Sequence, residues 1–311
     1  MFIAFIGLQG ANLVVNDDST LLTYVKFVGD FHTIGIGALL ALIGLFIIVV
    51  LHHKNIKGSI LIGILATWIL GMICEAIGLY VPDGKDFYSL YPTFRMIDFG
   101  AFGTTFGQCF NVDFSGVDIL NFIAVLFAFL FVDIFDTLGT LIGVSTKANM
   151  LDEEGKLPRI RPALLADAIA TSVGAIFGTS TTTTYVESSA GVAAGGRTGL
   201  SAMVTGLLFL LAIVFAPIFT AIPSFATAPA LIFVGFLMIS SIISIDFEDI
   251  TEAVPAYLAM LAMPLMYSIS EGIALGVISY VVINLCCGKA KKIKPLMYIL
   301  AVLFVLKYIF L

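Results

Sequence analysis

Four polar residues within an otherwise apolar stretch, 118–146, have the types and the spacing to bind a polar solute. Asp136, Thr137 and Thr140 follow Asp133 at +3, +4 and +7, and this spacing places all four side chains on one face of an α-helix. If that helix crosses a bilayer, a carboxylate turned toward lipid costs about 3 kcal/mol. We therefore expect the row to face protein or water, either as a functional site or as a structural polar contact between helices.

A second candidate site lies at residues 179–195, where the helical pattern breaks. Residues 179–186 read Thr-Ser-Thr-Thr-Thr-Thr-Tyr-Val, and the β-branched Thr and Val favour an extended backbone. Glu187 then opens a short Ala/Gly-rich segment that ends near Gly195. We expect a short strand followed by a half-helix, with Glu187 capping the half-helix, offering its carboxylate to a solute, or both. Such unwound backbone must be buried in protein or line a wet cavity, because lipid satisfies no N–H or C=O group.

The two sites together could recognise a flat heterocycle. A carboxylate accepts two hydrogen bonds at once, and a nucleobase offers ring and exocyclic N–H donors, which suits Asp133 and Glu187. Burial favours the neutral form of a carboxyl group, so Asp133, Asp136 and Glu187 are also candidate proton carriers. A supporting role behind these carboxylates is expected for three residues: Thr137, Thr140 and Asp167, the last in a row of small residues that allows close helix packing.

The composition requires a bilayer around these residues. Of the 311 residues, 60% are hydrophobic and only 12% are charged, whereas a soluble domain carries about a quarter charged residues. Apolar segments long enough, or nearly so, to cross the hydrocarbon recur at 34–52, 58–81, 118–146, 160–178, 199–221, 228–245, 255–270, 271–288 and 293–310. The chain is therefore predicted to be an all-α polytopic membrane protein. A soluble protein is excluded, and nucleic-acid binding has no support because no basic stretch is interleaved with aromatic residues.

Loop charges predict the orientation, because basic loops stay in the cytoplasm. The basic loops are 52–57, 147–161 and 289–294.

Residues 2–15 are short for a span and lack the features of a signal peptide, so they are expected to be the remainder of a longer helix. Residues 293–310 either cross the bilayer or lie along its surface. Glu75, near the outer end of its span, could simply snorkel to the interface and is not included in the candidate site. The four cysteines show neither metal-ligand nor disulfide spacing, and no metal or cofactor is expected.

Two long runs resemble one family of membrane proteins. FVDIFDTLGTLIGV at 131–144 and FGTSTTTTYVESSAGVAAGGRTGLSAMVTGLLFLLA at 177–212 resemble the AzgA-like branch of the nucleobase:cation symporter-2 (xanthine/uracil permease) family, the guanine–hypoxanthine and adenine permeases. NIKGSILIGIL at 55–65 and PSFATAPALIFVGFLM at 223–238 are similar to the same branch. The resemblance covers essentially the whole chain. It implies a fold of two inverted repeats of seven spans, in which a core domain moves against a gate domain with the substrate between them.

The resemblance also implies a domain organisation and a set of site residues. Four parts follow: gate-domain spans of the first repeat at 1–81 (the first incomplete), an outer interfacial loop at 82–117, core-domain spans of the second repeat at 118–222, and gate-domain spans with a C-terminal helix at 223–311. Asp133 and Glu187 would bind the purine, with Asp136 one turn further along. Backbone groups near Tyr185, Val186 and Ser188 would complete the contact. The first four spans of the family have no counterpart, so we expect an N-terminally truncated chain.

These observations predict a multi-pass secondary transporter of the plasma membrane. It would import hypoxanthine, guanine or adenine with protons by an elevator-type alternating-access mechanism, and the resemblance implies a homodimer. Two alternatives remain open. The chain could be a truncated fragment without transport activity of its own, or an intramembrane enzyme that uses Asp133 and Asp136 as a catalytic pair. The enzyme is disfavoured because intramembrane aspartyl enzymes generally draw their two carboxylates from different helices.

Overall fold

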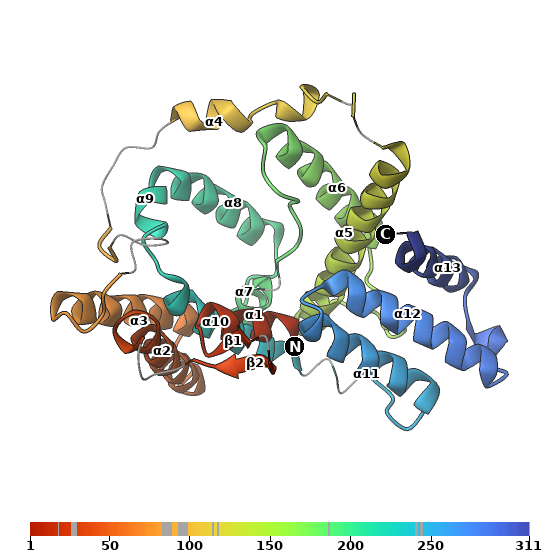
Figure 1. Ribbon diagram of the computed structural model, residues 1–311, viewed down its shortest axis with the longest axis horizontal. Helices are drawn as coiled ribbons and strands as arrows, with labels where there is room; N and C mark the ends of the chain where they lie inside the picture. Colours follow the sequence, from red (N-terminus) through yellow and green to blue (C-terminus); the bar gives the residue numbers. More distant parts are fainter. Residues whose placement is uncertain are drawn as a thin grey trace. The chain divides into compact units, whose positions relative to one another are not determined.

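The computed structural model describes residues 1–17, 19–25, 30–82, 89–92, 99–113, 115–116, 118–185, 187–239, 242 and 245–310. Nearly all the regular structure within these residues is helical (Figure 1), which confirms the predicted helical class. The chain divides into two compact units. The first unit comprises residues 1–2, 99–193 and 238–311, and the second comprises residues 3–98 and 194–237. Whether particular segments belong to a gate or a core domain stays a prediction.

Several helices have the length and composition of membrane spans. Within the described ranges, five apolar stretches are long enough to cross a bilayer: Phe31–His53 (a π-helical turn followed by α2, Ile36–His53), α3 (Ser59–Ala76), Val125–Thr146 within α5 (Ile119–Ala148), α6 (Ile160–Phe177) and α12 (Ile269–Cys286). Four shorter apolar helices accompany them: α8 (Gly199–Val214), α10 (Ser224–Met238), α11 (Ile250–Leu265) and α13 (Pro295–Phe310). Large apolar side chains cover their outer faces; Leu207 and Leu211 of α8, for example, are 59% and 56% exposed. Such faces suit lipid and not water, so the polytopic membrane class is confirmed.

The second unit is held together by α2, α3 and α10. Leu40 of α2, Trp68 of α3 and Phe225 of α10 belong to one buried cluster. Glycine allows α2 and α3 to approach closely, since a Cβ added to Gly44 would lie 2.2 Å from Oγ1 of Thr67. Small residues at helix contacts are the usual means of packing spans in lipid, where burial of apolar surface drives little association.

The N-terminal segment differs from the prediction of one apolar helix over residues 2–15. The helix α1 covers only Phe2–Gly10, and β1 (Val14–Asp17) then pairs antiparallel with β2 (Leu21–Tyr24). The carboxylate of Asp17 accepts hydrogen bonds from the hydroxyl and the N–H of Ser19 and from the N–H of Thr20, and these bonds lower the pKa of Asp17 to about 2. The prediction was wrong because apolar composition alone does not reveal a turn closed by an aspartate.

Glu75 bonds the segment that follows α3. Near the C-terminal end of α3, its carboxylate accepts the hydroxyl of Ser89 at 3.0 Å and the N–H of Leu90 at 2.9 Å. The indole N–H of Trp68 donates to the carbonyl of Leu90 at 3.0 Å, and the Leu90 side chain is fully buried. Glu75 thus anchors a part of the segment 82–117, which was predicted as an outer loop and which also contains α4 (Phe99–Thr105).

In the first unit, α11, α12 and α13 pack in series. Asp249 caps α11 by accepting the N–H of Thr251 at 3.0 Å, and Ser268 caps α12. The helix α13 returns along α12: Lys307 near its end bonds Glu271 in the first turn of α12, and Phe304 packs in the cluster built on α12 and α13. The helix α13 thus packs along α12, and whether residues 293–310 cross the bilayer or lie along its surface stays a prediction.

The ends of the predicted segments shift in the structure. The segment 199–221 is divided into α8 and α9 (Ala216–Phe219), with Pro217 in the first turn of α9. The segment 228–245 begins earlier, as α10 at Ser224, and that helix ends at Met238. Caps and prolines decide where a helix begins and ends, and hydrophobicity alone does not locate them.

Candidate functional site

The helix α5 carries the predicted polar row. Thr137 and Thr140 are 1% and 5% exposed, while Asp133 and Asp136 are partly buried. Because α5 is helical through all four positions, their side chains lie on one face. The row therefore belongs to the part of α5 that neighbouring protein covers, although α5 is otherwise lined with exposed apolar side chains.

The helix α6 adds Asp167 to this row. The hydroxyl of Thr137 donates to Oδ2 of Asp167 at 3.0 Å, and the carboxylates of Asp133 and Asp136 lie within electrostatic range of Asp167. Three carboxylates and one threonine hydroxyl thus gather where α5 faces α6. Like charges placed this close repel one another, and a proton or a solute donor relieves that repulsion.

One oxygen of this cluster has no protein partner. Oδ1 of Asp133 is enclosed, and none of the residues that the structure describes donates a hydrogen bond to it. An enclosed acceptor left unpaired costs about 1–3 kcal/mol, and more when it is charged. Natural structures rarely tolerate such an oxygen without a water, an ion or a ligand. Asp133 is therefore the residue of this cluster that is best placed to meet a solute.

The break in the helical pattern after α6 is present. Residues 179–185 are neither helix nor strand, and α7 (Ser188–Ala193) follows as a short helix. The N–H of Thr179 donates to the carbonyl of Gly174 at 3.0 Å, and the N–H of Thr182 donates to the hydroxyl of Thr171 at 3.3 Å. The predicted half-helix is thus found, but the predicted strand does not form over 179–185, because α6 and not a second strand supplies these hydrogen-bond partners.

The predicted residues around Glu187 lie on the exposed side of this segment. Glu187 immediately precedes α7 and is exposed, as are Tyr185 and Ser188. Val186 lies outside the described residues. Within the described part of the chain, no hydrogen bond or ion pair involves the Glu187 carboxylate. Its convergence with Asp133 on one solute therefore stays a prediction.

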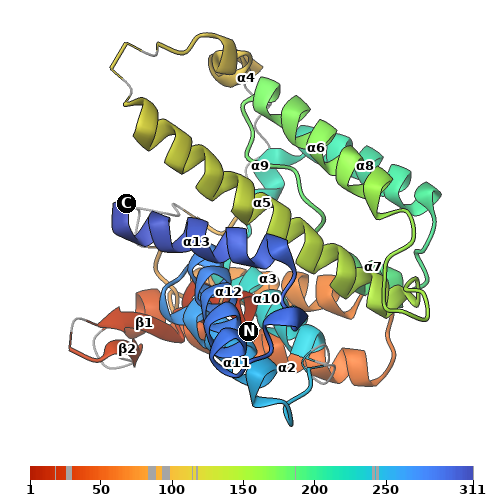
Figure 2. The ribbon, with the colours of Figure 1, turned by 90° about the vertical axis from the view of Figure 1, so that its right-hand side faces the viewer.

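Sequence reasoning missed Ser189. Its side chain is 3% exposed, and its hydroxyl has no partner among the described residues. It belongs to α7, which packs against α5 (Figure 2). The available signal was weak, since only its position two residues after Glu187 distinguished it from other serines of the chain.

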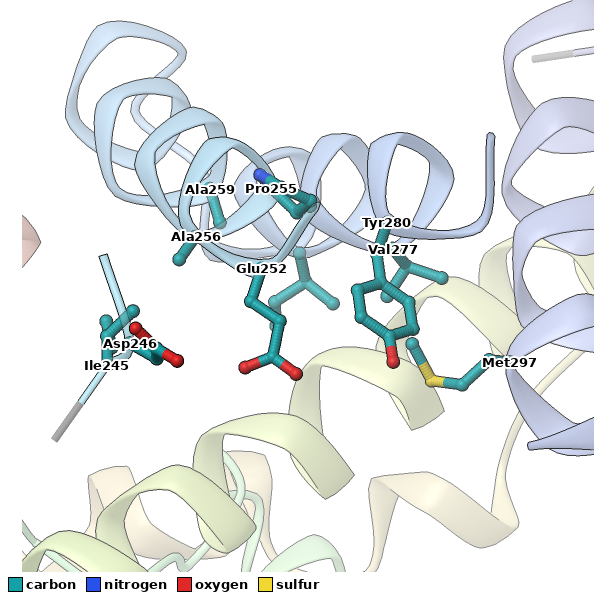
Figure 3. Close-up of a pocket in the computed structure, with 11 residues that line it drawn as sticks. Ile245, Asp246, Glu252, Pro255, Ala256, Ala259, Val277, Tyr280 and Met297 are labelled. Carbon is teal, nitrogen blue, oxygen red and sulfur yellow. The ribbon is translucent and has the colours of Figure 1, made fainter. Parts of the chain in front are cut away.

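A separate cavity of about 510 Å³ lies along α11 and α12 (Figure 3). Pro255, Ala256 and Val277 contribute apolar walls, and the polar ends of Glu252 and Tyr280 reach the same space. The Glu252 carboxylate pairs with Lys292 at 2.6 Å. None of the residues predicted for the solute site lines this cavity, and the ion pair ties the start of α11 to the segment after α12.

Beside α11, Asp249 connects the same two segments. Its carboxylate pairs with Lys289 at 3.0 Å and with Lys292 at 3.2 Å. The hydrogen bonds from Thr251 and Lys289 hold the pKa of Asp249 well below its usual range. Lys289 and Lys292 of the predicted cytoplasmic loop 289–294 thus have a structural role.

Comparison with known proteins places the chain among membrane permeases. Residues 1–292 match the family model Xan_ur_permease, described as a permease family. The chain is similar to the guanine/hypoxanthine permeases PbuG and PbuO of Bacillus subtilis (strain 168), with 43% and 44% identity over 311 and 310 residues. It is 40% identical over 310 residues to the adenine permease AdeP of Escherichia coli (strain K12). The alignments with PbuG, PbuO and AdeP cover 100%, 98% and 100% of this chain, respectively. They cover only 66%, 66% and 65% of those relatives, so the chain spans less than two thirds of the length of the proteins it matches.

Proposed function

The chain belongs to the permease family, and from that premise we propose that it takes part in the import of purine nucleobases across the cell membrane. The similarity to guanine/hypoxanthine and adenine permeases along the whole chain supports this substrate class. Family membership also favours a transporter over the intramembrane enzyme with an Asp133–Asp136 pair. The observation that carries the proposal is the enclosed, unpaired oxygen of Asp133 on a helix of membrane length.

In this function Asp133 accepts a ring N–H of the base. A carboxylate that is already desolvated and unpaired loses little on meeting such a donor, whereas a hydrated one must first shed water. Glu187 and the backbone near Tyr185, Val186 and Ser188 complete the contacts around the flat ring. This arrangement needs the base to enter between α5 and the segment that precedes α7.

Proton coupling follows from the carboxylate cluster. Three carboxylates in electrostatic range share a site in which one proton reduces the repulsion. The carrier candidates are Asp136 and Asp133, each of which interacts with two other carboxylates of the cluster, and Glu187. The segment 118–222 then moves with the bound base against the gate segments 1–81 and 223–311, in a homodimer of the plasma membrane.

Uptake measurements test the proposal. The chain, expressed within its full reading frame in cells that lack purine uptake, should accumulate radiolabelled hypoxanthine, guanine or adenine, and a protonophore should abolish the accumulation. Asp133→Asn and Glu187→Gln should each lower uptake about tenfold or more, equal to about 1.4 kcal/mol. Glu153→Gln, in an exposed loop, is the matched control and should change uptake less than twofold. Full uptake by both site variants would show that the site is assigned to the wrong residues.

A further inference from the structure

The cavity along α11 and α12 is large enough to hold a ligand other than the transported base. Its volume of about 510 Å³ falls within the range of about 300–1,000 Å³ that small-molecule sites occupy. None of the described residues that line it belongs to the carboxylate cluster of α5 and α6. The cavity is therefore a candidate for a second binding site.

The walls of this cavity are apolar. The lining residues of this kind include Pro255, Ala256 and Ala259 on α11 and Val277 on α12. The two helices approach closely on one side, since a Cβ added to Gly276 would lie 2.9 Å from the Cβ of Ala259. Water finds few hydrogen-bond partners between such walls, whereas a hydrocarbon chain fits them.

The polar groups that reach the cavity carry a negative charge without a cation. The carboxylates of Asp246 and Glu252 reach the same space (Figure 3), and Glu252 is paired with Lys292 at 2.6 Å. The Oδ1 atom of Asp246 accepts the N–H of Glu248 at 2.9 Å. No lysine or arginine among the described residues forms an ion pair with Asp246. Asp246 can therefore bind a cationic group of a ligand.

The segment between α12 and α13 brings a positive charge to the same cavity. Lys292 is bonded to Glu252 at the cavity, and Met297 of α13 lines the cavity. Lys294 lies on the short stretch of chain between these two contacts and is exposed. Within the described residues, Lys294 forms no ion pair. The rim of the cavity therefore carries an unpaired carboxylate and an unpaired ammonium group.

A ligand that matches this arrangement has an apolar chain, an ammonium group and a phosphate. An ammonium group donates three hydrogen bonds and suits the Asp246 carboxylate. A phosphate only accepts hydrogen bonds and suits Lys294. An aminophospholipid of the surrounding bilayer combines all three parts. The outer face of α11 already suits lipid, because Tyr257 and Leu261 are 55% and 41% exposed.

We propose that the cavity binds one aminophospholipid, with its ammonium group at Asp246, its phosphate at Lys294 and one acyl chain between the walls of α11 and α12. The lipid comes from the leaflet that borders the predicted cytoplasmic loop 289–294. This inference goes beyond purine import and does not depend on it, because no residue of the candidate solute site takes part.

Photolabelling of the purified protein tests the proposal. The protein, produced from its full reading frame, is mixed in detergent with a phosphatidylethanolamine that carries a photoreactive diazirine in one acyl chain, and mass spectrometry locates the adducts. We expect adducts on cavity residues such as Ala256 and Val277. Unlabelled phosphatidylethanolamine should compete about threefold better than phosphatidylcholine with the same acyl chains, because choline has no N–H and the Asp246 carboxylate is exposed.

Two variants separate the contacts of the headgroup. Asp246→Asn should bring the two competing lipids close to equal. Lys294→Gln should weaken both competitors about twofold without changing their ratio, since both carry the phosphate. The matched control is Glu248→Gln, which removes a charge from the same segment; Glu248 is exposed and does not line the cavity, so the ratio should stay as in the original protein.

Three results would overturn the inference. Equal competition by the two lipids in the original protein, or an unchanged ratio in Asp246→Asn, would show that Asp246 does not hold the ammonium group. Adducts confined to outward-facing residues such as Tyr257 and Leu261 would show ordinary lipid at the surface. Stronger competition by phosphatidylglycerol than by phosphatidylethanolamine would show that lysines alone attract the headgroup. None of these results bears on purine uptake, which is measured separately.

Discussion

The hydrogen bond from Thr137 to Asp167 offers the sharpest prediction about the carboxylate cluster. Replacing Thr137 with Val keeps the shape of the side chain but removes the hydroxyl that donates to Oδ2 of Asp167 at 3.0 Å. Thr137 is only 1% exposed, so water cannot easily replace this donor. A hydrogen bond to a charged group contributes about 1.5–3 kcal/mol. At about 1.4 kcal/mol per tenfold, Thr137→Val should lower the specificity constant for purine uptake by about 10- to 150-fold.

A double-mutant cycle distinguishes this bond from a general loss of packing. Asp167→Asn removes the acceptor charge, and if the two residues act through one bond, the double variant should be little worse than the more damaging single variant. Uptake rates at several substrate concentrations supply the four specificity constants, for the original protein, the two single variants and the double variant, each normalised to the amount of protein in the membrane. Thr146→Val is the control on the same helix, because that hydroxyl is exposed and bonds the carbonyl of Ile142. Fully additive losses would refute the idea that Thr137 acts by holding Asp167.

Two further predictions concern stability. Because hydrogen bonds lower the pKa of Asp249 in the folded state, its contribution is present above the ordinary pKa near 4 and disappears as the pH falls through the lowered value. The unfolding midpoints of the original protein and Asp249→Asn should therefore differ most near pH 7 and converge on strong acidification; a constant difference at all pH values would contradict this. Phe304 of α13 is 3% exposed and packs against Phe131 of α5. Phe304→Ala should lower the free energy of unfolding, and with it the midpoint. The loss should be smaller than in a soluble core, where it is about 3–5 kcal/mol, because lipid is also apolar. Val302→Ala, at a 58% exposed position, should leave the midpoint unchanged.

The helical framework and the polar row on α5 could be predicted from the sequence because both are periodic. Apolar runs of membrane length predict spans, and polar residues at +3, +4 and +7 predict one helical face, without any knowledge of distant contacts. The break in the helix at the threonine run preceding α7 could also be predicted, since β-branched residues at bilayer depth disfavour a continuous helix. The strand expected there could not be verified from the sequence, because strand formation depends on a pairing partner elsewhere in the chain.

Contacts between elements could not be predicted in the same way. The bond from Thr137 to Asp167 joins residues 30 positions apart, and the anchoring of Ser89 by Glu75 depends on how the following segment folds back. Ser189 resembles any other serine in the sequence, and its burial appears only once α7 packs on α5. Helix ends shifted for a related reason, since a cap such as Asp249 acts through one local hydrogen bond that hydrophobicity does not report.

Chemical labelling of Asp133 tests whether its enclosed carboxylate meets the transported base. A hydrophobic carbodiimide reacts with carboxyl groups inside membranes, and mass spectrometry of the α5 peptide locates the adduct. We predict that hypoxanthine at saturating concentration protects Asp133 from the reagent. Any adduct on Glu271, which lies in the first turn of α12 and is bonded to Lys307 and Tyr308 of α13, should be unaffected by the base. Labelling of Asp133 at the same rate with and without purine would contradict the account.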